Sequence, residues 1–539
     1  MPVQHEDAAA GPAVFRLAIT EPTAIDPYRA QEGEGILVTK ALFSGLLELD
    51  PQGRPAPATA VAWEHDAAGT RWVFRLRPDA RFSNGEAVTA ESFVRGWNRA
   101  LDPAADTETA YHLAGVEGFE LVRSGRADRL AGVTALDALT IEVRLSAPDF
   151  EFALKTLQPV FSPVPQCAGP ALNAEYNDRP IGNGPFLLAE PWQHGRSITL
   201  RRNPEWCGAA PELDEVRIDI LDPVSGIDDE YAGFVAGRYD FARIPPALLA
   251  DAAARDGKEG QAFLEKELAG LHYLIPFCHQ APMDSLDARR AVSAAIDRRR
   301  IAEEVFDGMR TPAHGLLSPW FGDAHRPGPL TPWTEYDPAA ARAAAGRAGL
   351  RPGTRVDLAY NTGAGHDAWV TAVAGDLTEV LGLEVRLLPM VARALVEYRT
   401  GEAAHGLCRA AWACDYPTPD NILFPLLHSS CTAPDAEGTA HGDNEGRYVS
   451  PEFDAMVVRA RAAEDAAERA RHWQDAELTA VQDLALVPLW YRTEQRVYAA
   501  DRFTGVELDF HGNPTLAAVA PHRPPVAART HNCSPYEGA

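Results

Sequence analysis

The chain has 539 residues, of which 76 are acidic and 50 are Lys or Arg, so its formal net charge is −26. Because a chain of this length is too long to form one hydrophobic core, two to four domains are expected. The acidic balance disfavours nucleic acid and anionic lipid surfaces as partners. No run of about 18 apolar residues is present, so no segment is predicted to cross a membrane.

The first part of the chain predicts strands interspersed with two helices. Three ranges alternate apolar and polar residues, as half-buried strands do: 14–19, 72–77 and 140–145. Apolar residues recur at helical spacing over 34–47 and again over 89–101, where Thr89 is a suitable N-cap. Glu32 and Glu34 therefore fall beside the start of the first helix, where acids are often only partners of the helix dipole.

The later part of the chain predicts an α/β arrangement. A glycine-rich turn at 181–186 leads into further strands at 198–201 and 216–221. Beyond Leu271, helices alternate with strands, the pattern of an α/β unit. The helices are expected at 288–305 and 339–350, with one or two more over 453–484. The strands are expected at 356–360, 383–388 and 487–491, the last one short and buried.

The stretch 409–420 (RAAWACDYPTPD) is the strongest candidate for a binding site. Apolar residues lead in as a buried strand would, and two prolines then stiffen the turn that carries Asp415. Trp412 and Tyr416 place aromatic rings on either side of this acid. A fixed carboxylate beside aromatic walls suits a cationic organic group such as a peptide α-ammonium. The alternative is a strand end with a solvated acid and two rings in the core.

The seven cysteines include no CxxC pair, and their spacing does not suggest zinc. Cys414 and Cys431 flank the segment after Asp415, where they could form a disulfide or remain buried thiols. The polar range 1–12 shows no signal peptide, so the chain is either cytosolic or a processed or trimmed form. The tail beyond Pro521 is rich in Pro, Ala and His and is expected to be frayed.

The order of these segments resembles one family over nearly the whole chain. The segments that carry the resemblance are 72–79, 82–91, 182–186, 202–206, 287–297, 336–341 and 448–454. They resemble the extracytoplasmic solute-binding proteins, family 5, which are the oligopeptide- and dipeptide-binding proteins of ABC importers. The range 182–186 reads Gly-Asn-Gly-Pro-Phe where the family has Gly-Thr-Gly-Pro-Tyr.

The resemblance implies an α/β, periplasmic-binding-protein-like fold of class II with an extra inserted domain. Its two lobes would be joined by a two-strand hinge near 270–271 and 491–492, and would bury the ligand on closing. The implied parts are a discontinuous lobe I (14–46, 170–270 and 493–525), an inserted domain II (47–169), a lobe III (271–492) and flexible termini (1–13 and 526–539).

The resemblance also implies roles for individual residues. Asp415 would hold the α-ammonium of the ligand, Arg409 would meet a ligand carboxylate, and Trp412 would line the pocket. Tyr111 would reach over the ligand from the inserted domain. Further ligand contacts would come from Gln31, Glu32, Glu34, Ala411 and Ala413. The alternative is a surface strand residue for Arg409 and core packing for the two aromatic rings. The family cysteine lies two residues before the acid, where this chain has Ala413, so a family disulfide does not transfer directly.

A peptide binder that accepts many sequences must recognise the main chain and the termini of its ligand. The expected ligand is therefore an oligopeptide or an amino-acid-like molecule, with arginine or Arg-containing peptides fitting the acidic balance. The expected protein is a monomeric, extracytoplasmic, cell-surface partner of an ABC permease, without cofactor or metal and without affinity for nucleic acid. Its Ala- and Arg-rich composition resembles that of actinobacterial members, some of which are encoded in antibiotic clusters such as that for clavulanic acid.

Three alternatives remain open. An enzyme is disfavoured because the sequence has no GxSxG, HExxH or P-loop motif, although a pair of catalytic acids stays possible. A family member with another cargo would bind a nickel chelate, haem, a sugar or one amino acid, whereas Asp415 favours a ligand with a free amine. The third alternative is a peptide receptor that serves no transporter.

Overall fold

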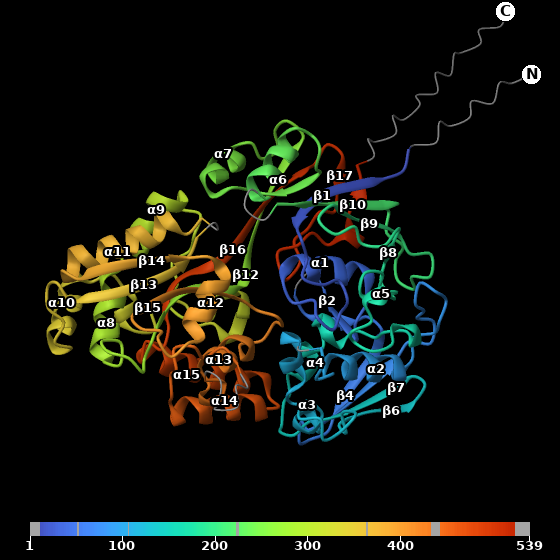
Figure 1. The fold of residues 1–539 in the computed structure, drawn as a ribbon, viewed down its shortest axis with the longest axis horizontal. Coiled ribbons are helices and arrows are strands. Elements are labelled where there is room, and N and C mark those ends of the chain that lie inside the picture. The colour runs from blue at the N-terminus through green and yellow to red at the C-terminus, as the bar shows by residue number, and fades with distance from the viewer. Residues whose placement is uncertain are drawn as a thin grey trace, which may run out of the picture.

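The computed structural model describes residues 11–50, 53–105, 107–222, 226–362, 365–432 and 442–522. The chain forms two lobes connected by two long strands (Figure 1). Of the ends predicted to be flexible, 1–10 and 526–539 lie outside the described residues, and Ala13 donates its main-chain N–H to Asp214. No helix of the described ranges is both long enough and apolar enough to cross a membrane.

The first lobe is built on a four-stranded sheet in the order β1-β10-β9-β8. β1 and β10 are parallel and the other pairs are antiparallel. Helix α1 packs on this sheet because Leu37 and Val38 share a core with Phe15 and Leu17. The elements are β1 (Val14–Thr20), α1 (Gly33–Leu42), α5 (Ala174–Asn177), β8 (Phe186–Leu188), β9 (Ser197–Arg202), β10 (Glu215–Leu221), α6 (Gly226–Val235), α7 (Leu249–Ala254), β17 (Phe503–Thr504) and β18 (Ala520–Pro521).

An antiparallel sheet with its own core extends the first lobe, in the order β4-β5-β7-β6. Trp72 and Phe74 of β5 pack in that core with Phe93 and Trp97 of α2. Thr89 and Ser92 form a capping box at the start of α2. The elements are β2 (Leu47–Leu49), β3 (Pro55–Pro57), β4 (Ala60–His65), β5 (Arg71–Leu76), α2 (Ala90–Ala100), α3 (Phe119–Arg123), β6 (Val133–Asp137), β7 (Thr140–Arg144) and α4 (Phe152–Lys155).

The second lobe is built on a six-stranded sheet in the order β11-β16-β12-β15-β13-β14. Its strands are β11 (Phe241–Arg243), β12 (Gln261–Pro276), β13 (Arg355–Asn361), β14 (Glu384–Met390), β15 (Leu407–Ala413) and β16 (Val487–Ala499). One core joins this sheet to α8 (Leu286–Ala295), α9 (Arg298–Phe306), α10 (Pro338–Arg347) and α11 (Asp367–Leu381). Another core joins it to α12 (Ala392–Thr400), α13 (Asp420–Leu427), α14 (Pro451–Ala462) and α15 (Ala466–Gln482).

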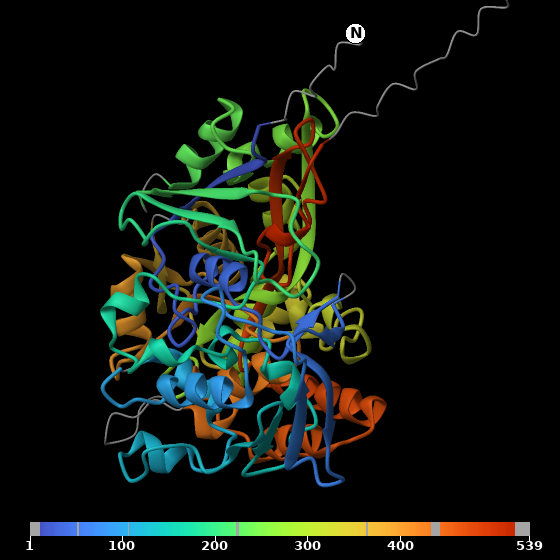
Figure 2. The same ribbon diagram turned by 90° about the vertical axis from the view of Figure 1, so that its right-hand side faces the viewer.

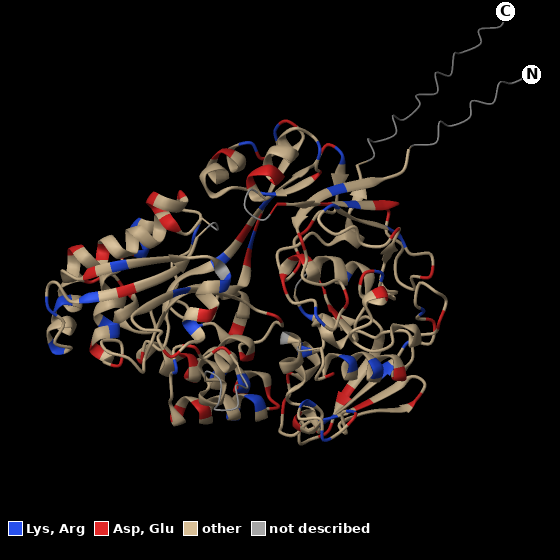
Figure 3. Ribbon diagram, in the orientation of Figure 1, with Lys and Arg blue, Asp and Glu red and all other residues tan. Residues whose placement is uncertain are grey.

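β12 and β16 connect the lobes and run side by side through the middle of the molecule (Figures 1 and 2). They pair antiparallel with an irregularity between Glu267 and Leu271, next to the crossover predicted at 270–271. Acidic and basic residues are spread over both lobes (Figure 3). The predicted two-lobe α/β fold is confirmed, and the finer domain limits stay our proposal.

Three sequence expectations differ from the structure. The helix expected over 34–47 ends at Leu42, and 47–49 forms strand β2. The helix expected over 288–305 is split, because Asp297 leaves the helix and caps α9 by accepting the N–H of Arg300. The short strand expected over 487–491 is the beginning of the 13-residue β16.

Candidate functional site

One edge of β15 is open along most of its length. β15 pairs with β12 over seven residues, but with β13 only at Leu407 and Cys408. The N–H of Cys414 donates to Ala269 on β12. Because alternate residues of an antiparallel strand face the same partner, the main-chain groups of the odd-numbered residues point to the other edge. Those residues are Arg409, Ala411 and Ala413, and this edge can accept an extended chain as an added strand.

Asp415 follows directly on this strand and is held in a defined orientation. Its Oδ2 accepts hydrogen bonds from the Tyr111 hydroxyl at 2.6 Å and from Asn421 Nδ2 at 3.1 Å. Asn421 also accepts the N–H of Asp415 at 2.8 Å and the indole N–H of Trp412 at 3.1 Å. A single amide at the start of α13 therefore fixes both the predicted acid and the predicted aromatic wall.

Tyr111 reaches this carboxylate from the part of the first lobe that contains the antiparallel sheet β4-β5-β7-β6. It belongs to the short 3-10 helix Glu108–Leu113, and its ring lies 4.0 Å from that of His112. Burial, and then the negative charge of Asp415, raise the pKa of Tyr111 well above its usual range, so its hydroxyl stays a donor. Burial lowers the pKa of His112, which stays neutral beside it.

The other end of the free edge is basic. Arg409 is half-buried and donates from Nη1 to Asn361 at 2.9 Å, while its Nε has no partner. Burial lowers its pKa to about 10, so the guanidinium remains charged at neutral pH. His366 is neutral, because burial and then Arg409 lower its pKa to about 3. Within the described ranges, no carboxylate lies in ion-pair distance of Arg409.

Two more basic side chains belong to this region. His272 faces Ala411 across the β12–β15 ladder, and burial, followed by Arg409, lowers its pKa well below the usual value. Arg310 donates to Gln495 Oε1 at 2.8 Å and is not in ion-pair distance of any described carboxylate. A buried cation without a carboxylate partner is a suitable site for an anionic group of a ligand.

The two acids of the predicted 31–34 loop already accept hydrogen bonds from neighbouring residues. Glu32 accepts the N–H of Thr23 at 2.7 Å, and Glu34 accepts the hydroxyl of Thr20 at 2.9 Å. Gln31 is partly buried, with a side-chain oxygen that lacks a partner. The acids of this loop are therefore engaged near the end of β1, and a ligand role for the loop stays a prediction.

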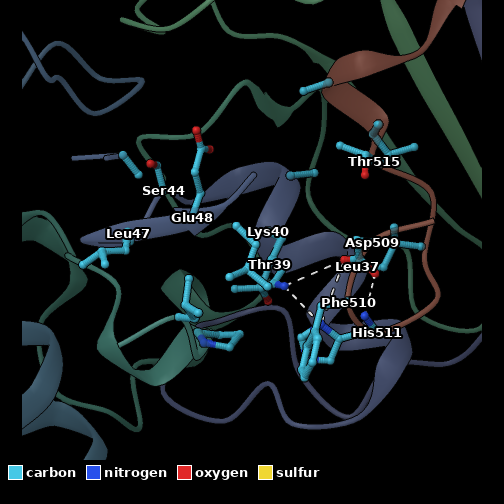
Figure 4. Close-up of a pocket in the computed structure, with 18 of the residues that line it drawn as sticks. Leu37, Thr39, Lys40, Ser44, Leu47, Glu48, Asp509, Phe510, His511 and Thr515 are labelled. Carbon is cyan, nitrogen blue, oxygen red and sulfur yellow. Dashed lines mark hydrogen bonds and ion pairs between the residues drawn. The ribbon is translucent and has the colours of Figure 1, made fainter. Parts of the chain in front are cut away.

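A cavity of about 620 Å³ lies where the two lobes meet, and Asp415 lines it. Most of its wall comes from α1, from the segment that contains β2 and from 507–518, while Trp320 and Pro417 close it from the second lobe. In Figure 4, Lys40 and His511 lie close together among apolar side chains. Lys40 Nζ is 3.1 Å from His511 Nδ1 and 3.8 Å from Asp509 Oδ2.

Cys414 and Cys431 are both buried free thiols, so the structure has no disulfide between them. Among the described residues, no group of three or more His, Cys, Asp and Glu side chains could hold a metal ion.

Sequence reasoning missed several residues of this region. Asn421 has no signal in the sequence, and the helix in whose first turn it lies, α13, was not predicted either. The other missed residues come from distant parts of the sequence. Only the folded chain brings His272 and Arg310 toward Arg409, and Lys40 and His511 to the cavity that Asp415 lines. Arg409 alone of the basic residues was expected, and only from the family resemblance.

Comparisons with known proteins identify the family and the fold of the chain. Residues 54–434 match the family described as bacterial extracellular solute-binding proteins, family 5 Middle. The Escherichia coli (strain K12) protein named "Probable deoxycholate-binding periplasmic protein YgiS" is 28% identical over 501 residues, which cover 88% of this chain and 86% of that protein. The periplasmic oligopeptide-binding protein OppA of the same strain is 27% identical over 492 residues, covering 89% and 87%.

The solved structure of the Escherichia coli murein tripeptide binding protein MppA has the same fold. It superposes with a TM-score of 0.79 over 95% of this chain and 99% of that one, at 24% identity. The family match, the two lobes and the strand pair between them lead to one conclusion. The chain belongs to the bacterial extracellular solute-binding proteins, family 5.

Proposed function

We propose that this protein captures short peptides with a free amino terminus between its two lobes and delivers them to an ABC permease. The observation that carries the proposal is the arrangement along β15. The strand has a free edge, Asp415 at one end and the unpaired cation Arg409 toward the other. An extended peptide has matching groups, namely main-chain hydrogen-bonding groups between an ammonium and a carboxylate.

The spacing of the two anchors favours a peptide over a single amino acid. Asp415 and Arg409 are six residues apart, so extended chain places their Cα atoms up to about 20 Å from one another. The two side chains shorten this span but do not close it to the size of one amino acid. A peptide of about three to five residues, each spanning about 3.3 Å, can contact both anchors.

The names of the relatives support a peptide as the ligand. OppA is named for oligopeptides and MppA for a murein tripeptide, whereas YgiS is named for deoxycholate, which has no amine. A ligand such as deoxycholate, which has neither an amine nor a peptide main chain, would leave Asp415 and the open edge of β15 without partners. We infer an extracytoplasmic, monomeric protein without a catalytic step, consistent with the periplasmic binding proteins that it resembles.

Substitution of the anchor tests the proposal. Asp415→Asn keeps the shape and the acceptor for Tyr111 but removes the charge. A charge-assisted hydrogen bond contributes about 1.5–3 kcal/mol, so a free-amine tripeptide should bind at least about tenfold more weakly. The N-acetylated tripeptide should bind poorly to the parent protein and lose little more in the variant. Titration calorimetry of both proteins with both ligands completes a double-mutant cycle.

The exposed acid Asp251 on α7 offers a matched control. Asp251→Asn removes the same charge away from the site and should leave both affinities unchanged. Equal losses for the two peptides in Asp415→Asn would show that the acid is structural. Native mass spectrometry of gently purified protein would identify a ligand that is retained, and a ligand without an amine would contradict the proposal.

A further inference from the structure

The cavity beside Asp415 contains donors that no acceptor satisfies. Gln158 lines it with only 3% of its surface exposed, and its Nε2 has no hydrogen-bond partner. His511 lines it with a side chain that is 9% exposed, and its Nε2 also lacks a partner. Buried polar groups are nearly always paired in folded proteins, so two unpaired groups in one cavity point to a ligand that supplies the partners.

The surroundings of His511 determine that its free nitrogen is a donor. Lys40 is 3.1 Å from Nδ1, and because an ammonium can only donate, Nδ1 must accept. Burial, and then the charge of Lys40, lower the pKa of the ring to about 3, so the ring is neutral and its one proton is on Nε2. His511 Nε2, Gln158 Nε2 and the ammonium of Lys40 are therefore three donors at one cavity.

The acids that line the cavity do not use these donors up. Asp509 accepts the main-chain N–H groups of His511 and Asn513 and lies 3.8 Å from Lys40, which leaves an N–H of the ammonium free. Asp50 is paired with Arg54 at 2.8 Å. Glu507 is exposed, and Glu48 is exposed in part while burial raises the pKa of its carboxyl; neither acid is hydrogen-bonded to Lys40, His511 or Gln158 among the described residues. The acid that remains is Asp415, which the proposed function assigns to the ligand ammonium.

The cavity is also connected to that anchor. Asp415 and Pro417 form part of its wall, and the main-chain carbonyl of Asp415 is near enough to the His511 ring to raise its pKa, although His511 Nε2 makes no hydrogen bond to it. His511 therefore neighbours both Lys40 and the main chain of Asp415, and all three residues line the same cavity. In a peptide whose ammonium binds Asp415, the side chain of the first residue is attached next to that ammonium. A long first side chain can therefore extend from Asp415 past the His511 ring toward Lys40.

We propose that this cavity receives the first side chain of the peptide and selects a long side chain that ends in hydrogen-bond acceptors, glutamate above all and glutamine next. The inference rests on the proposed function, because it needs the ammonium at Asp415. The apolar walls accommodate the methylene groups of such a side chain, and the donors of Lys40, His511 and Gln158 bind its terminal oxygens. A carboxylate would satisfy more of these donors than an amide does.

Four tripeptides that differ only in their first residue test the selection: Glu-Ala-Ala, Gln-Ala-Ala, Ala-Ala-Ala and Lys-Ala-Ala. In titration calorimetry the glutamate peptide should bind at least about tenfold more tightly than Ala-Ala-Ala, the glutamine peptide should lie between them, and the lysine peptide should bind most weakly. If Ala-Ala-Ala binds through Asp415 and the first residue makes no difference, the subsite is wrong while the proposed function stands. If none of the four binds, both fail.

Substitutions of single donors then test whether Lys40 and Gln158 cause the preference for a first glutamate. Lys40→Met should reduce the advantage of Glu-Ala-Ala over Ala-Ala-Ala to about twofold. Lys258→Met, at an exposed lysine outside the cavity, is the matched control and should change neither affinity. Gln158→Leu should reduce the advantage in part and decides the question if Lys40→Met does not fold. An undiminished preference for glutamate in folded Lys40→Met or Gln158→Leu protein would overturn the assignment.

Discussion

Lys155 offers a test of how the two lobes hold together. Its Nζ lies 2.6 Å from Asp149 on its own side and 2.8 Å from Asp420 at the start of α13 in the second lobe. Asp420 is 1% exposed and also accepts Arg461 at 2.6 Å. Burial alone would lower the pKa of Lys155, but Asp149 and Asp420 raise it above its usual range, so the network is fully charged.

Lys155→Met keeps the aliphatic stem and removes the charge. Removal of one partner from a buried ion pair costs about 3–5 kcal/mol, and because Asp420 keeps Arg461 we expect a smaller loss of about 2–3 kcal/mol. The loss applies to the closed form, since water replaces the lost contacts when the lobes separate. A peptide that binds only the closed form should therefore bind about 30- to 150-fold more weakly.

Calorimetry measures the affinity, and small-angle scattering with and without peptide measures the closure. The melting temperature of the ligand-free protein serves as a control, and Lys258→Met is the matched variant. An unchanged affinity in Lys155→Met would refute the reasoning. A fall in melting temperature that accounts for the whole loss would show that the network stabilises the fold rather than the closed arrangement.

Three further predictions concern the pH dependence, the carboxylate anchor and the fold. Glu151 lies against Arg469 of the second lobe, and burial raises its pKa to about 7. The closed form therefore binds a proton on Glu151 more strongly than the open form does. Peptide affinity should accordingly fall as pH rises from about 4.5 to 7. Glu151→Gln should flatten that profile in calorimetry at several pH values. Arg409→Gln should weaken peptides with a free C-terminus at least about tenfold and C-terminal amides much less. A Cβ at Gly182 would lie 1.8 Å from the Leu42 carbonyl, so Gly182→Ala should lower the stability by about 3 kcal/mol or more in denaturant titration.

The strands and most helices could be predicted because their signals are local. The alternation over 14–19 and 216–221 is visible in the sequence and corresponds to β1 and β10. The break between α8 and α9 was missed because apolar spacing continues across it, and only the capping role of Asp297 ends the first helix. The length of β16 was missed because residues 492–496 (RTEQR) are all polar, so no alternation of apolar and polar residues marks the strand there.

The site was predictable only in part. Asp415 stands out locally, but its contact with Tyr111 joins residues 304 positions apart and was expected only from the family resemblance. The glutamates near the start of α1 were expected at the ligand, and their own neighbours already engage them. The donors of the cavity come from three distant segments, and their lack of partners is a property of burial, which no spacing in the sequence encodes.

Substitution of Tyr111 can separate two roles proposed for Asp415, which are to bind the ligand ammonium and to connect the lobes. Both hydrogen bonds to its carboxylate go to Oδ2, so Oδ1 is left for a ligand ammonium while Tyr111 keeps its contact across the lobes. Tyr111→Phe removes the hydroxyl and keeps the ring against His112; loss of a hydrogen bond to a charged group costs about 1.5–3 kcal/mol. Because this cost affects closure rather than the ammonium, free-amine and N-acetylated peptides should weaken by the same factor of about ten or more. A loss confined to free-amine peptides in calorimetry would instead show that Tyr111 acts by orienting the carboxylate toward the ammonium.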